Sequence, residues 1–122
     1  MSQEHKDIVK KVDEAFTNNS MEDFFALCAD DVEWTMAGEG SHKGLDNIRE
    51  WMRSVHEGHE APAPKIMATK MIADGESVAS YGKMSMKDRD GNDSQFDYCD
   101  IYNFRDGKIA KLRSFVVKSP AE

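Results

Sequence analysis

The sequence predicts an α+β fold in which three N-terminal helices pack on a curved, mostly antiparallel sheet, so that the whole forms a cone-shaped α+β barrel. Apolar residues recur at helical spacing in the first half of the chain, and three Asp-Gly pairs follow at equal intervals of sixteen residues in the second half. Because Asp-Gly readily adopts the backbone of a tight hairpin turn, the equal intervals predict a meander of strands of similar length.

Length and charge limit the classes of protein to consider. The 122 residues fit a single domain, residues 1–122, because two pieces would each be too small to bury a stable core. The net charge of −7, with lysine and arginine scattered among acids, argues against nucleic acid and anionic membranes as partners. No apolar run approaches the about 20 residues of a membrane helix, and the N-terminus lacks the apolar stretch of a secretory signal. We therefore expect a cytoplasmic protein.

Three helices are expected before residue 60. In the first, residues 8–16, the apolar positions fall on one stripe. The second follows Ser20, where Ser-Met-Glu-Asp has the form of a capping box and the serine side chain would accept from a backbone amide. The third covers residues 45–57 and ends at Gly58. Between the second and third helices, a strand at 32–36 and a glycine-rich loop at 38–44 are expected.

The second half of the chain is predicted to form strands. Residues 61–64 contain two prolines and form a loop that joins the halves. Strands of the expected length usually bend, and a bent sheet under helices leaves a concave space of the kind that binds small ligands. The four expected strands are 65–72, 77–87, 95–104 and 109–117.

Three motifs are similar to those of one known family. They are ADDVEW at residues 29–34, the G…HKG approach to the third helix, and D-x-x-x-F-x-DGKI from Asp100 to Ile109. Together they make the chain resemble the SnoaL-like branch of the nuclear transport factor 2-like, or ketosteroid isomerase-like, superfamily. The resemblance implies a cystatin-like α+β barrel. It does not imply one reaction, because the superfamily includes isomerases, polyketide cyclases, dehydratases, epoxide hydrolases and non-catalytic modules.

The resemblance also implies which isomerase residues are kept. Asp100 matches the protonated aspartate that donates to the developing enolate. The general base falls on Thr35, which cannot serve as that base. The tyrosine of the oxyanion hole falls on Val12, and the aromatic residue near the end of the last strand falls on Val116. Three departures against one match argue against steroid isomerisation.

Alternation along strand 95–104 places Asp100 on an aromatic face. Such surroundings raise the pKa of a carboxyl and suit it to proton transfer near neutral pH. Alternatively, Asp100 bonds a neighbouring hydroxyl or amide and only helps to fix the sheet. Its neighbours Tyr98 and Tyr102 are candidates to hydrogen-bond a ligand carbonyl, although rings on a sheet face also serve as core. The residues of this face are Phe96, Tyr98, Asp100, Tyr102 and Phe104.

Two further residues are candidates for ligand contact. Trp34, on the first strand, has the same two interpretations as the tyrosines: a wall of the pocket or a part of the core. His42 stands in the glycine-rich loop near the expected mouth of the cavity, where it is a candidate base or a solvated surface residue.

No metal and no cofactor is expected. His56 and His59 are three residues apart with a glycine between them, unlike the zinc ligands of one continuous helix. The segment 88–93 has its glycine at the fourth position, whereas a calcium loop needs it at the sixth. Cys28 and Cys99 form no C-x-x-C motif and are expected to be free, mostly buried thiols.

Two functions follow from these observations. The first is a cofactor-independent acid–base enzyme of the isomerase, cyclase or dehydratase type, acting on a small apolar carbonyl or hydroxyl compound with Asp100 as proton carrier. The second is a non-catalytic ligand-binding or dimerisation module, because no second acid or base is evident beside Asp100. In either case a homodimer is expected through the outer sheet face, where Cys99, Ile101 and Phe115 would otherwise meet water.

Overall fold

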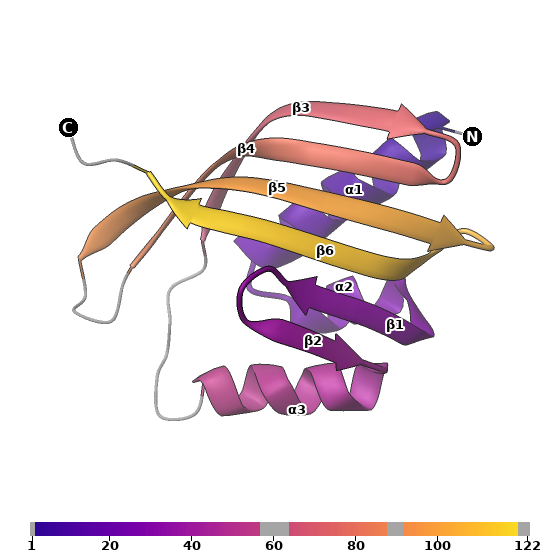
Figure 1. The fold of residues 1–122 in the computed structure, drawn as a ribbon, viewed down its shortest axis with the longest axis horizontal. Helices are drawn as coiled ribbons and strands as arrows, with labels where there is room; N and C mark the ends of the chain where they lie inside the picture. Colours follow the sequence, from indigo (N-terminus) through magenta and orange to yellow (C-terminus); the bar gives the residue numbers. More distant parts are fainter. Residues whose placement is uncertain (1, 57–63, 88–91, 120–122) are drawn as a thin grey trace.

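The computed structural model describes residues 2–56, 64–87 and 92–119. Within them, three helices and six strands form an α+β fold (Figure 1). In chain order these are α1 (Ser2–Thr17), α2 (Met21–Ala26), β1 (Cys28–Met36), β2 (Gly40–Lys43), α3 (Leu45–His56), β3 (Lys65–Asp74), β4 (Ser77–Lys87), β5 (Asp93–Arg105) and β6 (Lys108–Lys118).

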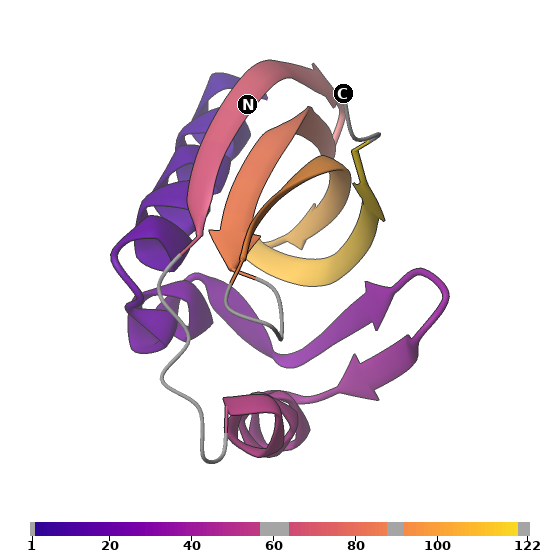
Figure 2. The same cartoon turned by 90° about the vertical axis from the view of Figure 1, so that its left-hand side faces the viewer.

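The six strands make one mostly antiparallel sheet in the order β2-β1-β6-β5-β4-β3. The expected four-strand meander is confirmed as β3 to β6, with strand ends within two residues of the predicted ones. The first strand, β1, joins the meander by pairing in parallel with β6. The sheet is strongly curved, as the view along it shows (Figure 2).

Two of the three Asp-Gly pairs form the predicted hairpin turns. Between β5 and β6, Asp106 and Gly107 both have positive φ, at 53° and 78°. This is the combination that a two-residue hairpin turn of the primed type requires, because its twist matches that of the flanking strands. Gly75, between β3 and β4, has φ of 58°. The third pair, at 90–91, lies outside the described residues.

The glycine-rich loop prediction is wrong at residues 40–43, which form strand β2. These residues pair antiparallel with the end of β1, so that His42 lies opposite Trp34. The sequence Gly-Ser-His-Lys has neither alternation nor β-branched residues. Pairing with an already formed neighbour therefore decides its conformation, which intrinsic strand propensity does not predict.

The helices divide between the two ends of the sheet. Helix α1 packs on β3 and β4 and along one side of the curved sheet, whereas α3 packs on β1 and β2 (Figures 1 and 2). We expected all three helices to lie across the concave side of the meander. The structure differs because β2 extends the sheet past β1 and gives α3 a surface of its own.

The predicted capping interaction of Ser20 is not formed. The serine hydroxyl donates to Asp23 Oδ2 at 2.7 Å, and the side chain makes no hydrogen bond to a backbone amide of α2. The helix it precedes has only six residues. Its position follows from the burial of Phe24 and Phe25 against the sheet, since so short a helix has little stability of its own.

The hydrophobic core lies between the helices and the inner face of the sheet. Val12 of α1 and Tyr102 of β5 are fully buried there. The other apolar side chains that are fully buried are Val9, Phe24, Val32, Ile48, Val78, Ile109 and Leu112. This packing directs one face of β5 toward α1 and so determines which of its polar groups are kept from water.

Candidate functional site

Strand β5 carries the polar centre of the inner face. In the sheet register Asp100 lies opposite Ser80 of β4 and opposite Ser114 of β6. Because residues directly opposite each other point to the same face, the three side chains form a polar row across three strands. Tyr98 and Tyr102 lie two residues to either side of Asp100 on the same face.

A pocket of about 150 Å³ opens beside Asp100. A cavity of this size holds one six-membered aromatic ring. Its walls are mainly apolar, which excludes water from a bound molecule and leaves a few polar side chains, among them Asp100 and Ser114, to orient it. The lining residues are Phe16, Trp34, Met36, Pro64, Ile66, Met84, Tyr98, Asp100, Ser114 and Val116.

The surroundings of Asp100 change its acidity. Burial raises the pKa of its carboxyl to about 7; a hydrogen bond from Ser114 opposes this rise, and the charge of Asp13 adds to it. Near neutral pH the carboxyl is therefore present in both its acid and its ionised form. Such a group can donate a proton and take it back at the same pH, which is the property of an efficient general acid or base.

Asp13 of α1 is a second carboxyl of this region. It is partly buried, and burial raises its pKa to about 6. Val9, four residues earlier, is fully buried, and Phe16, three residues later, lines the pocket, so Asp13 lies on the inward side of the helix. The charge of Asp13 acts on the pKa of Tyr98 as well as on that of Asp100.

Sequence reasoning missed Asp13. The available signal was its place in the apolar stripe of the first helix, between Val12 and Phe16, where a charged side chain is unusual. The position of Asp13 in this stripe does not by itself predict which strand its carboxyl faces.

Three buried hydroxyls lie near the two carboxyls. Among the described residues, Tyr98 Oη, Tyr102 Oη and Ser80 Oγ make no hydrogen bond of standard geometry, although Ser80 lies near enough to Tyr98 to lower its pKa as a hydrogen-bond partner. Leaving a buried hydroxyl unpaired costs about 1–3 kcal/mol, so groups of this kind usually meet a water or a ligand. Burial raises the pKa of Tyr98 to about 12 and that of Tyr102 well above 10. Both phenols therefore remain protonated donors.

Of the other residues predicted to contact a ligand, some line the pocket and others do not. Trp34 lines the pocket, whereas Tyr102 lies in the core behind it. His42 is not among the lining residues: its ring stacks on Trp51 of α3 at 4.4 Å between centroids, because β2 holds it opposite Trp34 and under that helix. Contact of Tyr102 or His42 with a ligand thus stays a prediction without support from the pocket.

The two cysteines have different surroundings. The Cys28 thiol is buried and donates to the carbonyl of Phe24 at 3.4 Å, and burial raises its pKa to about 12, so that it stays unreactive. Cys99 is partly buried on the outer side of β5.

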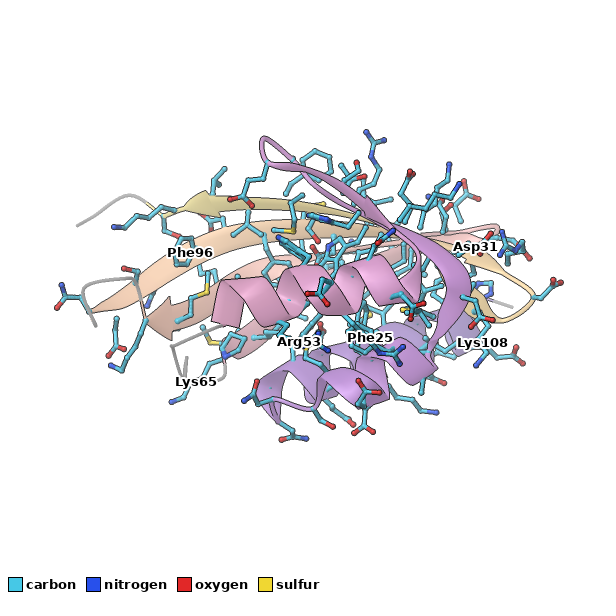
Figure 3. The ribbon with its side chains drawn as sticks, turned by 90° about the horizontal axis from the view of Figure 1, so that it is seen from below. Phe25, Asp31, Arg53, Lys65, Phe96 and Lys108 are labelled. Atoms are coloured by element: carbon cyan, nitrogen blue, oxygen red, sulfur yellow. The ribbon has the colours of Figure 1, made fainter. Side chains whose placement is uncertain are left out.

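A larger hollow of about 460 Å³ lies at the other end of the molecule, between α2, β1 and α3. Figure 3 shows Phe25 and Lys108 in this part, away from Phe96. Its cations are already engaged: Arg49 pairs with Glu22 at 3.2 Å, and Lys108 Nζ donates to the carbonyl of Ala26 at 2.9 Å. It holds no group with the unusual acidity of Asp100, so the candidate site is the smaller pocket.

Metal binding has no visible basis in the part of the chain that the structure describes, where no three His, Cys, Asp or Glu side chains cluster. His59 and residues 88–91 lie outside that part.

No helix among the described residues is long and apolar enough to cross a membrane.

Comparison with known proteins identifies the family. The family model of the SnoaL-like domain matches residues 9–112 of the chain. The chain belongs to the SnoaL-like family. The predicted resemblance is thereby confirmed, and with it the nuclear transport factor 2-like superfamily.

Solved structures share the fold of this SnoaL-like chain. An NTF2-like protein of unknown function from Burkholderia pseudomallei has a TM-score of 0.82 at 20% identity, with 93% of this chain and 90% of that one covered. TerC, co-crystallised with polyporic acid, has a TM-score of 0.80 at 18% identity, covering 95% and 92%. An LEH-like epoxide hydrolase from M. tuberculosis has a TM-score of 0.80 at 19% identity, covering 95% and 84%. No curated protein sequence matches the chain.

Proposed function

We propose that this SnoaL-like protein is a cofactor-independent acid–base enzyme that acts on a small, largely apolar carbonyl or hydroxyl compound. The observation that carries the proposal is the carboxyl of Asp100, whose pKa is about 7 and which lines a mainly apolar pocket. A partly buried carboxyl with this acidity destabilises the fold at neutral pH, and such costs are concentrated at functional sites.

The chemistry follows from the two forms of Asp100. In its acid form the carboxyl donates its proton to a substrate oxygen, and the resulting carboxylate then takes a proton from the neighbouring carbon, so that the substrate becomes an enol and Asp100 is again an acid. Apolar walls strengthen this interaction because they exclude competing water. The cycle ends with Asp100 in its starting form, so an isomerisation, a cyclisation or a loss of water is within its reach.

Size and relatives support a small organic ligand. The volume of about 150 Å³ suits a compact molecule with one ring or a short branched chain. A protein of the same fold was co-crystallised with polyporic acid, and another is an epoxide hydrolase. These two cases support a small organic ligand for this protein.

We also propose that the protein is a homodimer that pairs through the outer face of the sheet. Tyr81, Cys99 and Phe115 lie opposite one another across β4, β5 and β6 on this face. Tyr81 and Phe115 are 41% and 40% exposed, and Val117 nearby is 63% exposed. Adjacent apolar side chains of this kind on an exposed sheet face favour burial against a second copy.

The enzyme proposal is tested by exchange of substrate protons with solvent. Wild type and Asp100→Asn are incubated in deuterated water with a panel of small enolisable ketones and phenols, and deuterium incorporation is followed by NMR. We expect wild type to exchange the protons of at least one compound faster than the same solution without protein. Asp100→Asn should lower that rate about 10²-fold.

Asp106→Asn is the matched control. It makes the same chemical change in the exposed β5–β6 turn, and asparagine tolerates the positive φ of 53° found there. Equal exchange by wild type and Asp100→Asn, with ligand binding retained, would assign the protein to the alternative class of non-catalytic binding modules.

A further inference from the structure

Gly82 of β4 is a point of very close approach between β4 and the backbone of β3. A Cβ atom placed on Gly82 would overlap the carbonyl oxygen of Met67 and would lie 2.8 Å from the amide nitrogen of Thr69. Both atoms belong to the backbone of β3, so neither can rotate away as a side chain would. Glycine inside a strand often marks a close approach of this kind. The lack of a side chain at Gly82 is therefore what lets β3 lie where it does.

A bulge in β3 accompanies this approach. The strand pairs with β4 up to Ala68, opposite Gly82, and the pairing resumes at Lys70, opposite Tyr81, so that Thr69 is an extra residue. An extra residue bends a strand and increases its local twist. Strand β3 runs along the edge of the curved sheet, beside α1 (Figure 2). The bend places its backbone where an inner-face side chain of β4 would otherwise lie.

The first half of β3 carries one end of the pocket. Ile66 lines the pocket and is paired with Met84 of β4, which lines it too. Met84 in turn lies opposite Phe96, four residues from Asp100 along β5. At about 3.3 Å per residue, Ile66 and Met84 are therefore displaced by up to about 13 Å along the strand from the acid. These two side chains form the far wall of the pocket, at the end away from Asp100.

A ligand whose oxygen meets Asp100 must extend toward this far wall. On the other side of Asp100 the inner face is filled by Tyr102, which is fully buried in the core. The volume of about 150 Å³ leaves room for one ring between the acid and the far wall. None of the described residues that line the pocket carries a positive charge, so a neutral ligand is favoured over an anion.

We propose that Gly82 determines the size of ligand that the pocket accepts: it lets β3 close onto the inner face, so that Ile66 limits the site to neutral carbonyl or hydroxyl compounds with a single ring. This inference rests on the proposed function and deepens it by naming the class of substrate. Gly82 itself touches no ligand. It determines specificity through the position of the β3 backbone, and hence of the far wall.

The inference is tested by the binding of two neutral ketones that differ by one fused ring, acetophenone and 2-acetylnaphthalene. Binding is followed by NMR at the indole N–H signal of Trp34, which lines the pocket. We expect wild type to bind acetophenone about tenfold more tightly, or better, because the second ring meets the far wall. Ile66→Ala shortens that wall at a partly exposed position and should bind 2-acetylnaphthalene about tenfold more tightly than wild type does.

Ile72→Ala is the matched control. It makes the same chemical change on the same strand, at a side chain that is 51% exposed and does not line the pocket. It should keep the wild-type preference for acetophenone.

Gly82→Ala tests the close approach itself. The added methyl group overlaps the carbonyl of Met67, so the backbone of β3 must move away from the inner face. We expect the preference for one ring to fall, as in Ile66→Ala, and Tm to fall as well because the pairing of β3 with β4 is disturbed.

The inference is overturned if wild type binds neither ketone or shows no preference for acetophenone, or if Ile66→Ala keeps the wild-type preference. These results do not depend on the folding of Gly82→Ala. A folded Gly82→Ala protein that keeps the wild-type preference would also overturn it.

The outcome is separable from that of the exchange experiment. The expected preference without proton exchange on any substrate would retain the role of Gly82 and reject the enzyme. Exchange that depends on Asp100, together with equal binding of the two ketones, would retain the enzyme and reject the role of Gly82.

Discussion

Trp34 Nε1 donates a 3.0 Å hydrogen bond to Ser114 Oγ, and this bond joins two parallel strands beside the acid of the pocket. Both side chains are buried and both line the pocket. Since the indole occupies one acceptor position of the serine, the hydroxyl proton is available to Asp100. One serine therefore fixes a wall of the pocket and moderates the acidity of its carboxyl.

Ser114→Ala should raise the pKa of Asp100 further, because it removes the hydrogen bond that favours the carboxylate. It should also cost about 1–3 kcal/mol of unfolding free energy, since the buried indole N–H of Trp34 loses its acceptor. Carboxyl NMR titration and urea unfolding measure the two effects. Trp34→Phe, which removes the donor and keeps the serine, should destabilise without raising the pKa. An Asp100 midpoint unchanged in Ser114→Ala would show that the serine does not act on the acid.

Asp100→Asn should become more stable relative to wild type as pH rises from 5 to 8. The folded protein holds the Asp100 proton up to a pKa of about 7, against 3.8 for an unperturbed group, so it binds protons more strongly than the unfolded chain. This contribution is complete at low pH and is lost as pH rises toward 7. The variant does not titrate at this position and keeps its stability. Wild type loses about 2.7 kcal/mol between pH 5 and the pKa of about 7, at about 1.4 kcal/mol per pH unit. We therefore expect the difference in Tm to grow by about 10 °C, given about 4 °C per kcal/mol.

Thermal melts at pH 5, 6, 7 and 8 measure this difference directly. Asp106→Asn, in the exposed turn, should give a constant difference from wild type over the same range. If the Asp100→Asn difference is also constant, the carboxyl is solvated in the folded protein and its proposed acidity is wrong.

Val116→Phe should block the pocket. Val116 is one of its lining residues and lies beside Tyr98 in the sheet register, so a larger ring at this position fills a cavity of only about 150 Å³. We expect exchange activity and ligand binding to fall at least tenfold, with the unfolding free energy changed by less than about 1.5 kcal/mol because the added volume enters existing space. Val117→Phe, the next residue on the exposed outer side, is the control for the pocket and should leave exchange activity and ligand binding unchanged.

Phe115→Glu should convert the proposed dimer to monomers. The side chain is 40% exposed at the centre of the outer face, and a two-fold contact there would bring two negative charges together without solvent. Light scattering at micromolar concentration measures the mass. Lys11→Glu, which places the same charge on the exposed side of α1, should remain a dimer. A wild-type protein that is already monomeric at this concentration would rule out the dimer.

Local pattern was enough to predict the meander and the inner face of β5. Asp106 and Gly107 specify their turn through backbone preferences that act over two residues, and the alternation around Asp100 follows from strand geometry alone. The family was also readable, because its motifs are short stretches of sequence.

Tertiary structure decided the rest, because it depends on which distant segments meet. Strand β2 forms only against β1, and this pairing moved His42 from the expected mouth of the cavity to a position under α3. Asp13 shows the same limit: periodicity places it on the inward side of a helix, but only the docking of α1 on the sheet lets its charge act on the pKa of Asp100. Burial and charge at this site arise from contacts about ninety residues apart in the chain, which no local propensity encodes.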